Sequence, residues 1–152
     1  MKSAFAVLAL SFAFLLGNGQ VKRILPKTFK KVELGMPMED FAAVRKGLQT
    51  EDLSRDKFRY RWAETCKKKS AISSVVYYFS DTEEKSLYEM IIYYRDLRVR
   101  DAWLAKNYGT PNYKNGTEWR FASDLGFEVR AWRYEDRLVI VAAMPGTEWE
   151  ED

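Results

Sequence analysis

The chain lacks histidine altogether and carries a single cysteine among its 152 residues. Histidine is the commonest general base near neutral pH and the commonest metal ligand, so its absence removes Ser-His-Asp and Cys-His catalysis. A zinc site would have to be built from carboxylates alone, and no glycine-rich loop precedes a helix to hold phosphate. We therefore expect no enzyme activity, no metal and no cofactor. A hydrolase using a carboxylate pair stays open, since any two acids can meet in space.

Two isolated sequence features resemble reactive groups. Cys66 precedes three lysines in what reads as a loop, and flanking positive charge would lower the pKa of its thiol and raise its reactivity. Residues 54–57 (SRDK) match the S-x-x-K motif of penicillin-recognising enzymes. We interpret Cys66 as an incidental cysteine and residues 54–57 as a chance match in a polar loop. One cysteine also excludes an internal disulfide.

Long apolar runs are also missing, because the run from Ala4 to Leu16 falls well short of the roughly 20 residues of a membrane-spanning helix. Lys2 precedes this run and Gly17-Asn18-Gly19 follows it, which is the form of a signal peptide cleaved between Gly19 and Gln20. We expect residues 1–19 to be removed on export. Residues 20–152 are then a single compact α+β domain, periplasmic or secreted, without stable membrane insertion. An uncleaved anchor is the alternative.

The charge balance favours no particular partner, since the formal net charge is only +3. Residues 22–31 are basic and residues 148–152 are acidic, and we expect both stretches to be solvated tails rather than binding arms. Arginines and aromatics alternate over residues 58–62, which could stack nucleic-acid bases. The small net charge and the missing RRM signature argue against that function, so we expect no nucleic acid partner.

Hydrophobic periodicity predicts two helices and six strands. The first helix begins at Pro37, which suits a first helical turn, and ends at Gly47. Asp96 caps a second helix that stops at Gly109. Alternating or continuous apolar runs, separated by short polar turns, predict strands at residues 57–62, 72–79, 87–94, 117–123, 127–134 and 138–144. The last of these is apolar on both faces, so we expect it to be central in a sheet.

One helix followed by three strands thus occurs twice along the chain. The two units run over about residues 32–95 and 96–145, and short turns between strands imply antiparallel pairing. We predict an α+β fold of tandem αβββ units, with the helices packed on an antiparallel sheet.

Short motifs in both units resemble one family. Residues 34–41 (LGMPMEDF) are similar to the helix start of the small outer-membrane assembly lipoproteins, the BamE/SmpA family. Residues 108–111 (YGTP) are similar to the end of its helix, and residues 133–139 (RYEDRLV) to its closing hairpin. The resemblance implies a helix-plus-sheet module of the fold group that includes the β-lactamase inhibitor proteins. It also implies a place in the cell envelope and an envelope protein as partner.

Strand alternation predicts which side chains share the sheet face away from the helices. If the aromatic residues of 58–62 point at the helices, their arginine neighbours point away, and the same reasoning applies to residues 117–134. Arginine, tryptophan and tyrosine are enriched at binding hot spots. The predicted partner-binding residues are therefore Arg59, Arg61, Arg120, Arg130, Trp132 and Tyr134.

The leading hypothesis is an exported, non-enzymatic module that binds another protein through this open sheet face. The alternative is a small-ligand carrier, with an aromatic pocket between helices and sheet. Trp103, Tyr108 and Trp119 would line that pocket.

Overall fold

The computed structural model describes residues 23–45, 50–55 and 59–150. The expected signal peptide lies outside this part of the chain, and so do Gly47 and Phe58. The described residues form a short 3₁₀ helix η1 (Lys27–Phe29), two α-helices and one sheet. The helices are α1 (Met38–Val44) and α2 (Leu97–Asn107). The strands are β1 (Thr50–Arg55), β2 (Arg59–Thr65), β3 (Ile72–Ser80), β4 (Leu87–Tyr94), β5 (Glu118–Ala122), β6 (Glu128–Tyr134) and β7 (Arg137–Ala142).

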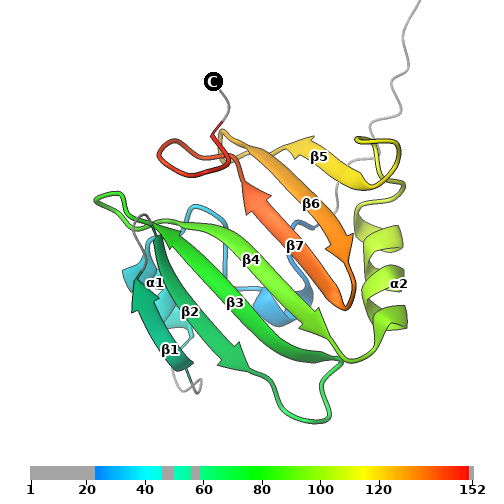
Figure 1. The fold of residues 1–152 in the computed structure, drawn as a ribbon, viewed down its shortest axis with the longest axis horizontal. Coiled ribbons are helices and arrows are strands. Elements are labelled where there is room, and N and C mark those ends of the chain that lie inside the picture. Colours follow the sequence, from blue (N-terminus) through cyan, green and yellow to red (C-terminus); the bar gives the residue numbers. More distant parts are fainter. Residues whose placement is uncertain (1–22, 46–49, 56–58, 151–152) are drawn as a thin grey trace, which may run out of the picture.

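The seven strands form one sheet in the order β1-β2-β3-β4-β7-β6-β5, and every neighbouring pair is antiparallel. The α+β class and the antiparallel sheet are thereby confirmed. The last strand of the first half, β4, pairs with the last strand of the second half, β7 (Figure 1). As expected from its two apolar faces, β7 is a central strand.

Strand β1 is the element that periodicity missed. Its sequence, TEDLSR, has one apolar residue, and it pairs on one side only as the edge of the sheet. The interpretation of residues 54–57 as a polar loop was therefore wrong for Ser54 and Arg55, which belong to β1. The order is helix, four strands, helix, three strands, so β1 stands outside the expected αβββ repeat, and the repeat itself stays a prediction.

Both helices begin as the sequence indicates. Pro37 is the N-cap of α1, and Glu39 and Asp40 lie in its first turn, where they complement the helix dipole. The Asp96 side chain caps α2 by accepting a hydrogen bond from the backbone N–H of Arg98 at 3.0 Å. The helix ends before Gly109, which adopts a positive φ of 73° that suits a residue without a Cβ.

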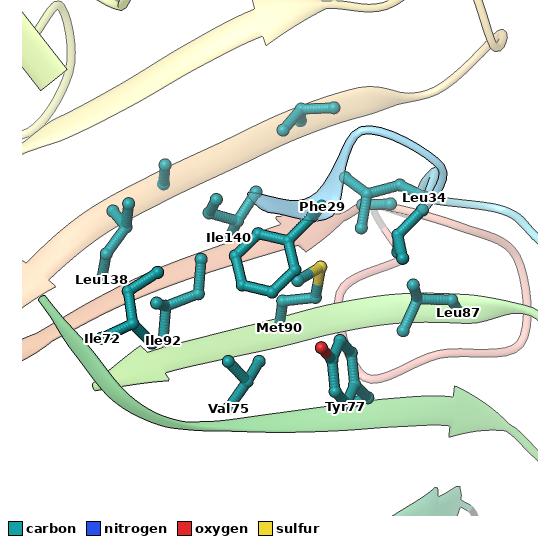
Figure 2. Close-up of a cluster of buried hydrophobic side chains, with 14 of the residues drawn as sticks. Phe29, Leu34, Ile72, Val75, Tyr77, Leu87, Met90, Ile92, Leu138 and Ile140 are labelled. Carbon is teal, nitrogen blue, oxygen red and sulfur yellow. The ribbon is translucent and has the colours of Figure 1, made fainter. Parts of the chain in front are cut away.

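The helices and the segment before α1 cover one face of the sheet (Figure 1). Phe41 of α1 packs against the rings of Trp62, Tyr77 and Phe79, with ring centroids 4.6 to 5.2 Å apart. Between the helices, residues 23–31 fold over the middle of the sheet with their basic side chains exposed. The expectation of solvated charges holds for these residues, but the expectation of a free tail was wrong. Phe29 of this segment is 1% exposed and lies above Met90 and Ile140 of the central strands (Figure 2).

The edge strand β5 is covered by the loop before it. The Asn112 amide donates to the backbone carbonyl of Arg120 at 2.8 Å, and its carbonyl oxygen accepts from the N–H of the same residue at 2.8 Å. Tyr113 exchanges backbone hydrogen bonds with Glu118 one pair further along. Two positions on the outer edge of β5 are therefore already hydrogen-bonded.

No helix among the described residues is both long and apolar enough to cross a membrane.

Candidate functional site: the open face of the sheet

The sheet face opposite the helices is organised in rows that cross the strands. One row consists of Arg61, Tyr78, Glu89, Val141, Arg130 and Arg120, paired strand to strand from β2 to β5. The next row consists of Ala63, Val76, Ile91, Val139, Trp132 and Glu118. A charged and aromatic row therefore lies beside a mostly apolar one. We call this surface the open face.

All six residues predicted for partner binding lie on the open face, because their neighbours in the strands, such as Tyr60, Val129 and Ala131, belong to the core. They do not form one cluster. Arg120, Arg130 and Trp132 come together on β5 and β6, whereas Arg59 and Arg61 lie on β2. Tyr134, at the end of β6, is 56% exposed and its ring is contacted by the Arg137 guanidinium.

The β5–β6 group lines a pocket of about 320 Å³ together with Lys114, Glu118 and Trp149. Arg120 pairs with Glu118 at 2.7 Å, and its guanidinium lies 3.6 Å from the centre of the Tyr113 ring. Arg130 is buried and pairs with Glu128 at 2.7 Å. The arginines are thus held in fixed positions by carboxylates and an aromatic ring.

Glu118 shows how the cations dominate this pocket. Burial alone would raise the pKa of its carboxyl, but hydrogen bonds from Arg120 and Lys114 outweigh burial and lower that pKa below its ordinary value. The carboxylate is therefore charged at neutral pH and holds both cations at the pocket wall.

Sequence reasoning missed the segment that follows β7. We call residues 143–150 the strap: instead of being solvated, they turn back over the open face. Trp149 packs on Trp132, with ring centroids 5.4 Å apart. The Glu148 carboxylate accepts hydrogen bonds from Arg59 at 3.1 Å and from the Tyr88 hydroxyl at 3.1 Å. A tryptophan inside an acidic run was the available signal, since an aromatic ring is costly to leave in water.

Glu89 was also missed. It lies in β4 on the open face, is 6% exposed, and accepts a hydrogen bond at 3.3 Å from the Trp149 indole N–H. Burial raises the pKa of its carboxyl from 4.5 to about 7. The indole donor and Arg59 lower that pKa, and the nearby Glu148 charge raises it. A glutamate within the otherwise apolar run of β4 was the signal for this group.

The three residues expected to line an aromatic ligand pocket contact one another in turn, but Tyr108 and Trp119 do not line the pocket that Trp103 lines. Tyr108 and Trp119 are buried and pack edge-on, with ring centroids 5.9 Å apart. Trp103 is half-buried and contacts Tyr108, but it also lines a second pocket of about 560 Å³. This pocket lies between α2 and the segment around η1, with Ile72 and Tyr94 among its lining residues.

Cys66 differs from its expected state. It follows β2 and is half-buried, and its carbonyl accepts a hydrogen bond from Arg95. Burial, followed by the charge of Glu64, raises the pKa of its thiol, although Arg45 and Arg95 oppose the shift. The expected lowering of the thiol pKa by the three lysines was therefore wrong, while the interpretation of Cys66 as an incidental cysteine stays a prediction.

These features define a class: an α+β protein with one antiparallel sheet, helices on one face, and an arginine- and tryptophan-bearing open face on the other. Comparison with family models, with curated proteins and with solved structures finds no match for this chain. Among the described residues, no group of three or more cysteine, aspartate or glutamate side chains is placed to hold a metal ion.

Proposed function

We propose that this chain is a non-enzymatic protein-binding module whose partner is contacted through the open face. The observation that carries the proposal is the pairing of the two rows described above. The first brings Arg120 and Arg130 together on β5 and β6, with Arg61 at its other end. The second supplies an apolar strip in which Val76 and Val139 are buried and Ile91 and Trp132 are half-buried. Protein interfaces combine an apolar centre with arginine and aromatic anchors, and this face offers both.

The fixed positions of the arginines support a binding role. Arg59 lies 4.1 Å from the centre of the Tyr78 ring, and Arg120 lies over Tyr113. Stacking of this kind leaves a guanidinium with less rotamer freedom to lose when it meets a partner. The non-enzymatic part of the proposal rests on the absence of histidine from the sequence.

We place this activity outside the cytoplasm, in the cell envelope or beyond it. Residues 1–19 have the form of a signal peptide, and the BamE/SmpA-like motifs favour an envelope protein as the partner. An internal duplication belongs to the same proposal. It is supported by the antiparallel pairing of β4 with β7, which joins two helix-plus-sheet halves through their last strands.

The test is a cross-linked capture of this chain, as exported, from its own envelope or secreted fraction, read by mass spectrometry. We expect one stoichiometric protein partner that is lost with Arg130→Ala/Trp132→Ala. Because Arg130 is buried, a second pair, Arg61→Ala/Tyr134→Ala, repeats the test at more exposed positions.

The matched control is Arg98→Ala/Val99→Ala, on the exposed side of α2, which should keep the partner. Circular dichroism establishes that each variant is folded. Capture of the same partner by all folded variants would overturn the proposal.

A small-ligand carrier is the second candidate function, and the 560 Å³ pocket favours it. Its floor includes Ile72, Tyr94 and Trp103, while Arg23, Lys27 and Lys106 also line it. Within the part of the chain that the structure describes, these three cations have no acidic partner. An apolar floor with cations beside it suits an anionic amphiphile, such as a fatty acid.

Titration with a long-chain fatty acid, followed by tryptophan fluorescence, tests this second function. The wild type should show saturable quenching, and Trp103→Phe should remove most of it. A Trp132→Phe variant, on the opposite face, is the control and should quench like the wild type. Absence of saturable quenching in the wild type would end the carrier hypothesis.

A further inference from the structure

The strap is held in a compact turn by its own hydrogen bonds. Pro145 and Gly146 form its bend, in which Gly146 has a positive φ of 77° and Thr147 N–H donates to the Met144 carbonyl at 3.3 Å. Proline followed by glycine suits the central positions of a type II turn. The Glu150 carboxylate accepts from the Gly146 N–H at 2.8 Å, which closes the turn. The strap therefore arrives at the open face as an ordered unit.

Two consecutive side chains of this turn contact the open face, one acidic and one aromatic. Glu148 binds Arg59 and Tyr88 at the β2–β4 side of the face. Trp149 fills the space beside Trp132 and donates its indole N–H to Glu89. Two of the six residues predicted for partner binding, Arg59 and Trp132, are thereby engaged by the chain itself.

These contacts use the interactions that an external peptide would use. A carboxylate meets a guanidinium and a hydroxyl, which gives charge-assisted hydrogen bonds. The Trp149 indole packs on the Trp132 indole, and its N–H is directed at the buried Glu89 carboxyl group. The site is thus complementary to an acidic residue followed by an aromatic one, in an order and spacing that the strap makes explicit.

Resting on the proposed function, we infer that the strap is an internal ligand of the open face, and that the partner binds by displacing it with an acidic residue beside an aromatic residue. The partner's acid takes the place of Glu148 against Arg59, and its aromatic ring takes the place of Trp149 against Trp132. The pocket of about 320 Å³ next to Trp149 is lined by Arg120 and Arg130 and receives a further side chain of the same partner.

The strap is covalently connected to β7, and this connection sets how strongly the strap competes with a partner for the open face. A short covalent connection gives an effective concentration on the order of millimolar or above, so a weakly bound segment still occupies its site. A partner must overcome this occupancy, and its apparent affinity falls by the factor that the strap imposes. Removal of the strap contacts should therefore tighten binding without changing any residue of the sheet.

The experiment uses the full chain in two forms, the wild type and an open variant with Glu148→Gln and Trp149→Ala. The probe is a synthetic peptide of residues 143–150, and its binding is measured by isothermal titration calorimetry, which needs no signal from Trp132. Three matched peptides replace its glutamate by glutamine, its glutamate by lysine, or its tryptophan by alanine, at the positions of 148 and 149. A Glu33→Gln chain is the control, because Glu33 is an exposed glutamate on the segment before α1.

The open variant should bind the unaltered peptide at least tenfold more tightly than the wild type and the Glu33→Gln chain do. Each altered peptide should bind at least fivefold more weakly, and Trp132→Ala in the open variant should abolish binding. Equal binding by wild type and open variant, no binding to the open variant, or equal binding of all four peptides would each overturn the inference.

Capture of the natural partner separates this inference from the function on which it rests. A partner that binds wild type and open variant equally well supports a protein-binding module but overturns strap displacement. Peptide competition that follows the expected order, with no partner in any fraction, supports the internal ligand and counts against the proposed function. The two failures are therefore distinguishable.

Discussion

Trp149 lies against Trp132 with their ring centroids 5.4 Å apart and their planes inclined at 54°. Two indoles at this distance and inclination couple their electronic transitions, which should give a paired positive and negative band in the far-ultraviolet circular dichroism. We expect Trp132→Phe and Trp149→Phe to remove the same band, since each deletes one half of the pair. Trp103→Phe, whose ring contacts Tyr108 instead, should retain it. Difference spectra that disagree between the first two variants would show that the strap does not dock in solution.

Glu89 should make the protein less stable as pH rises. Its pKa is raised by burial from 4.5 to about 7, so the folded state holds a proton that the unfolded state releases at lower pH. The resulting stability is fully present below pH 4.5 and is lost as pH rises through about 7. Relative to Glu89→Gln, which cannot ionise, the wild type should lose up to about 3 kcal/mol of unfolding free energy across that range.

Urea unfolding of both proteins at pH 5 and pH 8 measures this difference. The groups facing Glu89 are Arg59 and Glu148, whose charges oppose one another in their effect on its pKa. As a control for the loss of another carboxylate, the comparison is repeated with Glu150→Gln, which should follow the wild type at both pH values. A constant gap between wild type and Glu89→Gln at the two pH values would contradict the raised pKa.

Glu64 should be the costliest carboxylate to remove from the covered face. It is 4% exposed, pairs with Arg45, and accepts a hydrogen bond from the Tyr77 hydroxyl at 2.8 Å. Glu64→Ala leaves the half-buried Arg45 uncompensated, which costs about 3–5 kcal/mol in buried pairs. Denaturant unfolding should show this loss, whereas Glu33→Ala, at an exposed position, should stay within about 0.5 kcal/mol of the wild type. Equal effects of the two substitutions would refute a buried ion pair.

Cys66 should react slowly for a cysteine followed by three lysines. Because burial and Glu64 raise the pKa of its thiol, a smaller fraction is thiolate at neutral pH than in an unfolded peptide. Alkylation by iodoacetamide at pH 7.5 should be several-fold slower in the folded chain than in a Cys-Lys-Lys-Lys peptide. In 8 M urea the two rates should converge. A folded chain that reacts as fast as the peptide would contradict the raised pKa of this thiol.

Most strands could be predicted because the order of their apolar and polar residues follows the burial of those residues in the sheet. The ranges predicted for β3 and β4 agree with the structure to within one residue, since both strands are bounded by polar turns. Residues 50–55 gave no such pattern, because an edge strand pairs on one side and needs few apolar residues. A local pattern of apolar and polar residues indicates which residues are buried. Strand β1 is held instead by its hydrogen bonds to β2, which such a pattern does not show.

The open face was predictable for a related reason, and the strap was not. Alternation fixes which side of a strand each arginine occupies, so Arg120 and Arg130 could be placed together. The docking of the strap depends on a bend at Pro145-Gly146 and on contacts with three different strands, β2, β4 and β6. The residues close to position 149 in the sequence include none of those strands, and its acidic neighbours suggested that it is exposed to solvent.

The Asn112 amide has a consequence for self-assembly. Open antiparallel sheets grow into fibrils when both edges accept another strand. Here Asn112 and Tyr113 occupy hydrogen-bonding positions along β5, so addition of a strand at that edge would have to break existing bonds. The remaining edge of the sheet is β1. Growth of a sheet into a filament needs both edges, so in the part of the chain that the structure describes the hydrogen bonds of Asn112 and Tyr113 to β5 oppose such growth.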